Sequence, residues 1–367
     1  MKIFRDTHPA PVLGIYVHPY AQQYYRLAIP LRAAYGAENV AVTAYDSISA
    51  EQRQAAKLVV TSRLQTLDTQ PATMAYQLAR EIIGNNQRRL LIDIDDDLTP
   101  WPGLGRERIM ALARASHGIV CTNSILAGRL RSLNPNVTIV PNYIDMATWP
   151  IAPITPPADK PTLLITGSPS HEQDWREVMP ALEQLRGRYR LKVVGFLPNY
   201  LQPFADEYVP WTLELSDYPQ LIQGAHIALC PLPRTAFNRC KSPIKIYETA
   251  LAGCAVIGSE TQYGDVLRAA GLSHRVVGLN NPWAAILRDY FEHPELIARD
   301  AHVLRHHVIT TIDASRHADM LREADGGYDV LDNGNTDRRM EHHPVQPGRR
   351  NHRISRNGGS GSVRHGI

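Results

Sequence analysis

The hydrophobic residues of this chain gather in short unbroken runs, and amphipathic stretches of helical spacing lie between those runs. Short runs rich in Val, Ile and Leu are typical of strands buried on both faces of a parallel sheet. In the first part of the chain, the predicted strands are 11–17, 40–44, 58–61, 90–94, 118–121 and 137–140. The predicted helices are a stretch ending at Ala34 with a kink at Pro30, then 50–57, 73–83, 106–115 and 124–132. This alternation predicts a parallel sheet with helices on both faces.

A Pro-rich segment at 149–161 interrupts the pattern and predicts a stiff connector. Beyond it, a second series of strands is predicted at 162–166, 191–194, 208–213, 227–230, 255–257 and 275–277. The helices predicted with them are 174–186, 219–223, 243–251, 283–290 and 294–308. We therefore expect doubly wound domains at 1–148 and 162–325. Their active site is expected in a cleft between them, at the carboxyl ends of the strands.

Composition narrows the classes of function. The chain has 367 residues, enough for two cores, and its net charge of +3 implies no strong overall field for nucleic acid or membranes. The basic surplus is local, because seven Arg oppose Asp337 and Glu341 in 335–367. Periodicity stops near 326, so 326–367 is predicted to be a basic disordered tail.

The cysteines and the first residues of the chain indicate the cellular compartment of the protein. The four Cys form no CxxC pair, which is typical of reduced core residues. Asp6, His8 and Pro9 stand where a signal peptide needs an unbroken apolar region, and no stretch is long enough to span a membrane. We expect a cytoplasmic protein.

The most informative stretch is 241–260, KSPIKIYETALAGCAVIGSE, which predicts a capped helix running directly into a buried strand. Ser242 is a suitable N-cap with Pro243 at the first helical position, and Gly253 ends the helix. A helix N-terminus with Lys241 and Lys245 favours phosphate, and a sugar diol fits beside Glu248 one turn further on. The alternative is an ordinary solvated Lys and Glu pair on a helix surface.

Several stretches in this order resemble the GT-B glycosyltransferases, specifically the family 4-like group that uses nucleotide-sugar donors. They are 241–260, the run GIVCTNSILAGRLRSLNPNVTIVPNYID at 118–145, and ITGSPSHEQDW at 165–175. The likeness covers roughly 11–310. It implies GT-B architecture, two Rossmann-like domains facing a cleft: the first on the acceptor side, the second on the donor side. It also implies a retaining hexosyltransferase-like enzyme with a UDP- or GDP-sugar as substrate and no tightly bound cofactor.

The resemblance also implies residue roles on the donor side. Glu248 corresponds to the glutamate that bonds the ribose hydroxyls, and Lys241 lies near the donor diphosphate. Fixed cations at that place stabilise the negative charge that the leaving group gains. The further donor-binding candidates are Asn238, Arg239, Ser242, Lys245, Gly167 and Ser168.

The sequence departs from the family pattern at three places. Cys240 stands eight positions before Glu248, where the family often has a first glutamate, and Asn238 is a partial substitute. The loop 167–171 lacks the usual Arg and Lys pair. Tyr143 stands where a glycine is usual. These departures also suit a non-catalytic GT-B protein that binds a sugar or nucleotide.

The first domain offers acceptor-side candidates. Asp93, Asp95, Asp96 and Asp97 end a predicted strand, and such crowding suggests a divalent metal, but the resembling proteins generally need none, so we expect no metal. Asp95 or Asp96 orients the acceptor or caps the next loop. The residues that follow the first strand and line the acceptor side are His18, Tyr24 and Arg26. No catalytic base is assigned; the candidates are Asp95, Asp96 and His18.

The acceptor admits alternatives. A saccharide, lipid-linked or protein glycan hydroxyl is expected for a retaining transferase. The Arg-rich tail suggests a second acceptor class, DNA with hydroxymethylated pyrimidine bases, because Arg contacts phosphate irrespective of base sequence. The same tail also suits a solubilising appendage.

Overall fold

The structure is a computed structural model. It describes residues 4–17, 21, 23–62, 70–84, 87–99, 104–210, 217–278, 282–314, 318–324, 326 and 330–331. The described residues up to 331 belong to one compact unit. The tail predicted at 326–367 lies outside the described residues except at 326 and 330–331.

The first sheet contains the six strands expected from the hydrophobic runs. In chain order they are β1 Val12–Tyr16, β2 Val40–Ala44, β3 Leu58–Ser62, β4 Arg89–Ile94, β5 Gly118–Cys121 and β6 Val137–Ile139. They pair in the order β2-β1-β3-β4-β5-β6, and every pairing is parallel. The strand order reverses at β1, where β2 lies on one side and β3 on the other. In doubly wound sheets, ligands bind outside the carboxyl ends of the strands at such a point.

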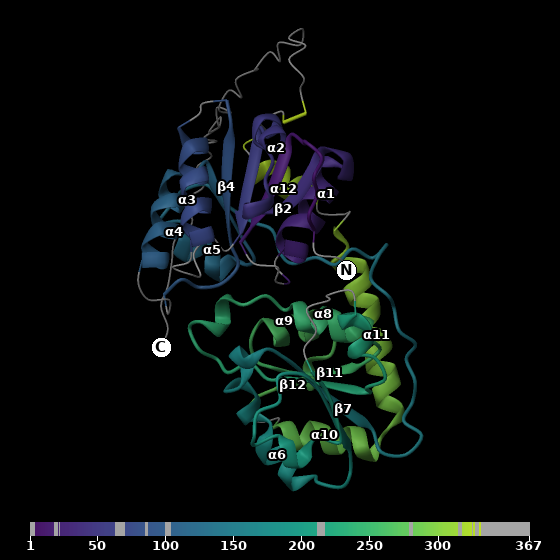
Figure 1. Cartoon of the computed structure of the whole chain (residues 1–367). Helices are drawn as coiled ribbons and strands as arrows, with labels where there is room; N and C mark the ends of the chain where they lie inside the picture. The colour runs from purple at the N-terminus through teal and green to yellow at the C-terminus, as the bar shows by residue number, and fades with distance from the viewer. Residues whose placement is uncertain are drawn as a thin grey trace, which may run out of the picture. The chain divides into compact units, whose positions relative to one another are not determined.

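Helices cover both faces of this sheet (Figure 1). They are α1 Ile29–Tyr35, α2 Ala50–Ala55, α3 Gln70–Ile83, α4 Leu104–Ala115 and α5 Ser124–Leu130. The predicted helix ending at Ala34 is two elements. A π-helix, η1 Gln23–Ala28, leads directly into α1, and Pro30 lies in the first turn of α1. Pro suits a first turn because its missing N–H would have had no partner there.

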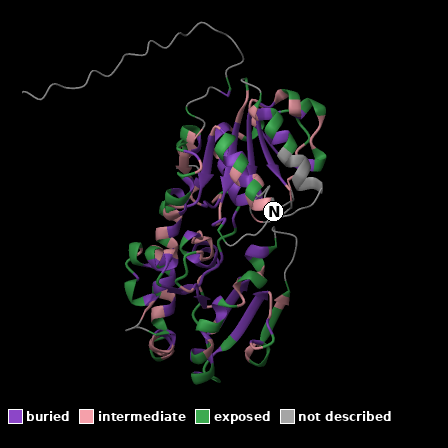
Figure 2. Ribbon diagram, turned by 90° about the vertical axis from the view of Figure 1, so that its left-hand side faces the viewer, coloured by how far each residue is buried: buried purple, intermediate pink, exposed green. Residues whose placement is uncertain are grey.

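The second sheet is also entirely parallel. Its strands are β7 Thr162–Gly167, β8 Arg190–Gly195, β9 Glu207–Pro210, β10 Ile227–Cys230, β11 Ala255–Ser259 and β12 Val276–Val277. Their order, β12-β11-β10-β7-β8-β9, is the doubly wound order with its reversal between β7 and β10. Most strands of the two sheets are buried, whereas the edge strands β6 and β9 are partly exposed (Figure 2). The buried strands are the ones that stand out in the sequence as unbroken apolar runs.

The helices of the second sheet match the predicted ones with two differences. They are α6 Met179–Gln184, α7 Tyr218–Leu221, α8 Ile244–Leu251, α9 Gln262–Ala269, α10 Trp283–Glu292 and α11 Glu295–Thr311. The predicted helix at 174–186 is a 3-10 turn, Asp174–Glu177, followed by α6, because Pro180 starts a helix more readily than it continues one. Helix α9 was not predicted.

The last described helix, α12 Ala318–Ala324, differs from the expected division of the chain at 325. It packs against α1, β5 and β6 of the first sheet. Arg322 donates to the Ala34 carbonyl at 2.6 Å, and the Tyr143 hydroxyl lies 3.2 Å from the Met320 sulfur. The chain therefore returns to the first sheet after completing the second.

No helix among the described residues is both long enough and apolar enough to cross a bilayer.

Candidate functional site

The reversal between β7 and β10 brings together the start of α8 and the loop after β7. Lys245, in the first turn of α8, donates from Nζ to the Thr166 carbonyl at 2.8 Å. A Cβ placed on Gly167 would lie 2.5 Å from the same Nζ. Two donor-side candidates, Gly167 and Lys245, are therefore neighbours at the carboxyl end of β7. Burial lowers the pKa of Lys245 to about 8.

His171 and Asp174, which were not among the predicted site residues, join this group. The His171 Nδ1 lies 2.7 Å from the Asp174 carboxylate, and the other Asp174 oxygen accepts from the Asn238 amide at 3.2 Å. Burial and the nearby Lys245 lower the pKa of His171 to about 4. The imidazole is thus neutral near pH 7. Its signal in the sequence is the spacing of His and Asp three residues apart after a buried strand.

Glu248 lies one turn beyond Lys245 and is only 5% exposed. Its Oε1 accepts from the Tyr25 hydroxyl at 2.5 Å, and its Oε2 accepts from the Tyr218 hydroxyl at 3.3 Å. Burial raises the pKa of Glu248 to about 7, while the two phenols and Lys245 oppose that rise. Glu248 is therefore a buried carboxyl, unlike the solvated helix residue that was the alternative from sequence. Neither tyrosine contact was predicted. Tyr25 belongs to η1 and Tyr218 to α7, and both are distant from Glu248 in the sequence.

The remaining donor-side candidates lie just before α8. Lys241 has its Nζ 3.8 Å from Asp96 and 4.7 Å from the centre of the Phe237 ring. Arg239 is exposed, whereas Asn238 is buried and also donates to the Pro233 carbonyl at 3.0 Å.

Two serines complete that set. The Ser168 hydroxyl lies 2.9 Å from the Ser170 hydroxyl in the loop after β7. The N-cap prediction for Ser242 was wrong. Helix α8 begins at Ile244 with Pro243 as its N-cap, and within the described part of the chain the buried Ser242 hydroxyl has no hydrogen-bond partner. The ψ of Pro243 is +24°, outside the helical range, so the first helical residue is Ile244 and not Pro243.

Cys240, at the position of the missing glutamate, is fully buried. Its carbonyl accepts from the Asn123 amide at 2.6 Å, and its side chain packs in the core cluster that contains Ile92 and Leu126. Burial raises the pKa of its thiol. Cys240 thus contributes packing at this point.

The acceptor-side candidates occupy different environments. Arg26 is 3% exposed and donates to Asp93 at 2.6 and 2.9 Å, to the Val140 carbonyl at 2.5 Å and to Asn142 at 3.0 Å. Arg26 therefore links η1 to the end of β4 and to the segment after β6. Its guanidinium is occupied by these contacts, so it is not available to an acceptor. The Tyr24 hydroxyl lies 3.3 Å from that of Thr148. His18 lies outside the described residues.

The aspartate run is divided among separate partners. Asp93 binds Arg26 and Ser62, Asp96 faces Lys241, and Asp97 binds Arg129 and Thr99. Asp95 is of intermediate exposure and contributes charge beside Arg26. Across the described ranges, no three His, Cys, Asp or Glu side chains come together as a metal site would require.

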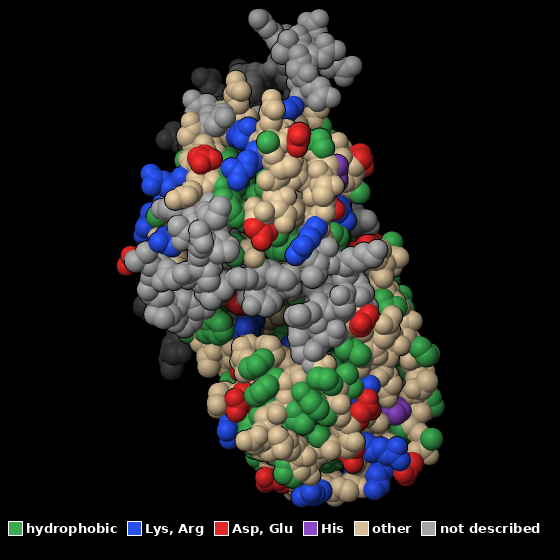
Figure 3. All heavy atoms as spheres, in the orientation of Figure 1, with side chains coloured by type: hydrophobic (Ala, Val, Ile, Leu, Met, Phe, Trp, Pro, Cys, Tyr) green, Lys and Arg blue, Asp and Glu red, His purple; other side chains and the backbone are tan. Residues whose placement is uncertain are grey.

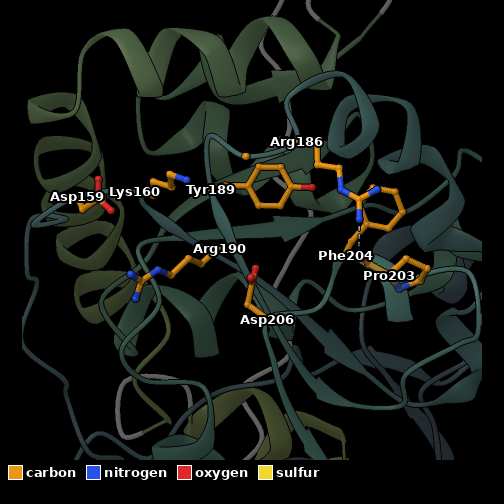
Figure 4. A pocket seen from close by; sticks show the side chains of 9 residues that line it. Asp159, Lys160, Arg186, Tyr189, Arg190, Pro203, Phe204 and Asp206 are labelled. Atoms are coloured by element: carbon orange, nitrogen blue, oxygen red, sulfur yellow. Dashed lines mark hydrogen bonds between the residues drawn. The ribbon is translucent and has the colours of Figure 1, made fainter.

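A pocket of about 330 Å³ lies elsewhere, at the amino ends of β7, β8 and β9 (Figure 4). Its lining includes Lys160 just before β7, Arg190 at the start of β8 and Asp206 just before β9. Ligands of doubly wound sheets bind at the opposite edge. The donor-side candidates lie at that opposite edge, so this pocket is separate from them.

No family model matches the sequence, and no curated protein is similar to it in sequence. Solved structures match the fold. HepE of Anabaena, determined with UDP-glucose, covers 86% of this chain and 99% of its own, with 12% identity and a TM-score of 0.60. WaaG, a glycosyltransferase involved in lipopolysaccharide biosynthesis, covers 86% and 100%, with 14% identity and a TM-score of 0.58. This chain has the GT-B fold.

A third solved structure gives the same result over less of its length. A TarM variant of S. aureus, in complex with fondaparinux, alpha-GlcNAc-glycerol and UDP, has a TM-score of 0.52 and 10% identity. The match covers 73% of this chain and 55% of the TarM chain. The GT-B architecture of two parallel doubly wound sheets, expected from the sequence, is thus confirmed.

Proposed function

We propose that this protein is a retaining glycosyltransferase that moves a sugar from a UDP- or GDP-sugar to a hydroxyl acceptor on a saccharide, lipid-linked or protein glycan. The observation that carries the proposal is the convergence of Lys245, His171 and Gly167 at the reversal between β7 and β10, with Glu248 one turn away. HepE and TarM, which share the fold, were solved with UDP or UDP-glucose. These matches favour a uridine nucleotide.

In this mechanism the second sheet stabilises the leaving group. As the bond from the sugar to the diphosphate breaks, the diphosphate gains negative charge. Lys245 and the backbone of the loop at Gly167 supply fixed positive potential, and His171 donates a hydrogen bond once phosphate raises its pKa. Such fixed groups act more strongly on the transition state than on the ground state. The departing phosphate accepts the proton of the attacking hydroxyl on the same face, so no protein base is needed.

Titration calorimetry with UDP, GDP and their glucose conjugates tests donor binding. Glu248→Gln should weaken uridine nucleotide binding about 10- to 100-fold, because hydrogen bonds to a charged carboxylate contribute about 1.5–3 kcal/mol. The matched control is Glu260→Gln, since Glu260 is half exposed and pairs with Arg268 on the surface. Absence of binding to any nucleotide would refute the proposal.

Transfer is measured separately from binding. Release of UDP in the presence of saccharide acceptors, with the product anomer read by NMR, tests both catalysis and retention. Nucleotide binding without hydrolysis or transfer would instead favour the non-catalytic binder. The DNA alternative rests on the Arg-rich tail at 335–367, which lies outside the described residues. On the face in Figure 3, the described Lys and Arg are interspersed with Asp and Glu.

Donor affinity should depend on pH through Glu248. Its pKa is about 7, and ribose hydroxyls donate to the ionised form. Below pH 7 the protonated form predominates and must lose its proton on binding, so affinity should rise about tenfold between pH 6 and pH 8 and then level off. Glu248→Gln should remove this rise. An unchanged pH profile in Glu248→Gln would contradict the assignment.

A further inference from the structure

Both carboxylate oxygens of Glu248 already accept phenol hydrogen bonds. Tyr25 donates to Oε1 at 2.5 Å and Tyr218 donates to Oε2 at 3.3 Å. A carboxylate has room for more than two hydrogen bonds, but Glu248 is only 5% exposed. A ribose diol therefore reaches this carboxylate only if one of the phenols moves away.

The two phenols differ in what else holds them. The Tyr218 hydroxyl also lies 3.3 Å from Thr166 at the end of β7, so Tyr218 is fixed within the second sheet's own elements. Tyr25 comes from η1, which follows β1 of the first sheet and is 223 residues distant from Glu248 in sequence. Its ring packs against Tyr24 and Trp149 with centroid separations of 5.1 and 6.5 Å. Tyr25 is therefore the phenol whose departure does not disturb the second sheet.

Element η1 is itself held in an unfavourable arrangement. It is a π-helix of six residues, all of them buried, and π-helices are rare and concentrated at functional sites. Gln23 is 1% exposed, and neither its Oε1 nor its Nε2 has a hydrogen-bond partner among the described residues. An unpaired buried polar group destabilises the arrangement that contains it. Contacts made outside η1, among them Tyr25 with Glu248 and Arg26 with Asp93, hold it in place.

We propose that Tyr25 competes with the ribose of the donor for Glu248, so that donor binding frees η1 from its contact with α8 while Arg26 still holds it to the first sheet. Since η1 also carries Tyr24, an acceptor-side candidate, this exchange couples donor binding to the acceptor side. The inference rests on the proposed function because it takes the ligand of Glu248 to be a nucleotide ribose. It adds Tyr25 as a residue that sets donor affinity.

Tyr25→Phe tests the competition, because it removes the hydroxyl and keeps the ring. Calorimetry with UDP should show affinity about 10- to 100-fold higher than wild type, the scale of one hydrogen bond to a charged carboxylate. Tyr16→Phe is the matched control. Tyr16 lies in β1 of the first sheet, and its hydroxyl donates to the Phe4 carbonyl at 2.7 Å. UDP affinity should therefore not change. Equal or lower affinity in Tyr25→Phe would overturn the competition.

A double-mutant cycle guards against a general effect of the substitution. With Glu248→Gln in place, Tyr25→Phe should no longer raise UDP affinity, because the competing pair is already altered. A gain of the same size in both backgrounds would also overturn the proposal. The freeing of η1 is read from hydrogen exchange of the backbone amides of 23–28, which should quicken in wild type when UDP is added and be quick in Tyr25→Phe without UDP. Unchanged exchange of these amides in wild type with UDP bound would contradict the coupling.

The outcomes separate this inference from the proposed function. If wild type binds UDP and Glu248→Gln does not, but Tyr25→Phe gains nothing, the donor site stands and only the competition fails. If wild type binds no nucleotide, both fail together.

Discussion

Arg26→Met is expected to lower the free energy of unfolding by about 3–5 kcal/mol, the range observed when one partner of a buried ion pair is removed. The side chains of Arg26 and Asp93 are 1% and 0% exposed. Met fills much of the space of Arg but leaves the Asp93 carboxylate buried with only Ser62 donating to it. It also removes the donors to Val140 and Asn142 at the end of the first sheet.

Thermal unfolding followed by circular dichroism measures this loss, which corresponds to a decrease in Tm of about 6–20 °C. Arg268→Met is the control, because its partners Glu260 and Asp265 are 50% and 75% exposed and such surface pairs contribute about 0–1 kcal/mol. Equal losses in the two variants would show that the buried pair is not a principal support of the first sheet.

The loss of unfolding free energy in Arg26→Met should also depend on pH. Burial raises the pKa of Asp93, and Arg26 opposes that rise. Without Arg26 the pKa rises further, so the folded variant favours the protonated carboxyl. A group with a raised pKa in the fold costs stability as the pH increases above its unfolded pKa. The difference from wild type should therefore be smallest in acid and largest above the folded pKa.

Most of the strands could be predicted from the sequence because they are buried on both faces and have few polar interruptions. The edge strands β6 and β9, which are partly exposed, are the exceptions to this burial. Runs such as 58–61 and 90–94 became β3 and β4 with nearly the predicted bounds. The positions at which the strand order reverses could not be predicted from the sequence, because they depend on which strands pair. Order within a sheet is set by contacts between distant segments, and hydrophobic periodicity carries no information about them.

In the candidate site, too, some residues could be predicted from the sequence and some contacts could not. Lys245 and Gly167 were selected from the residues and the family resemblance, and the structure brings them together at one strand end. The environment of Glu248 could not be predicted, since Tyr25 approaches it from a different sheet. The assignment of Ser242 failed for a local reason. Both Ser and Pro favour helix starts, but Pro243 occupies the cap position itself and leaves the serine outside the helix.

Gly167→Ala is expected to reduce kcat/KM about 10²- to 10³-fold, the loss typical of removing one group that stabilises developing charge. The new Cβ would lie 2.5 Å from the Lys245 Nζ, 3.1 Å from His171 and 3.2 Å from Trp175. Trp175 is 1% exposed and has no room to move, so the lysine must leave. Its bond to the Thr166 carbonyl then breaks, and the fixed charge at the end of β7 is lost.

Gly187→Ala separates this effect from backbone strain. Gly187 has a φ of +85° and Gly167 a φ of +152°, so alanine is strained at both, but nothing lies within 4 Å of the Cβ position at Gly187. The control should lose about 1–2 kcal/mol of stability and keep its kcat/KM. Lys245→Met should reproduce the kinetic loss of Gly167→Ala, and the double variant should lose little more, because both changes remove the same charge. If Gly167→Ala and Gly187→Ala transfer sugar equally well, or if the two losses add in full, the position of Lys245 beside Gly167 is not what stabilises the leaving group.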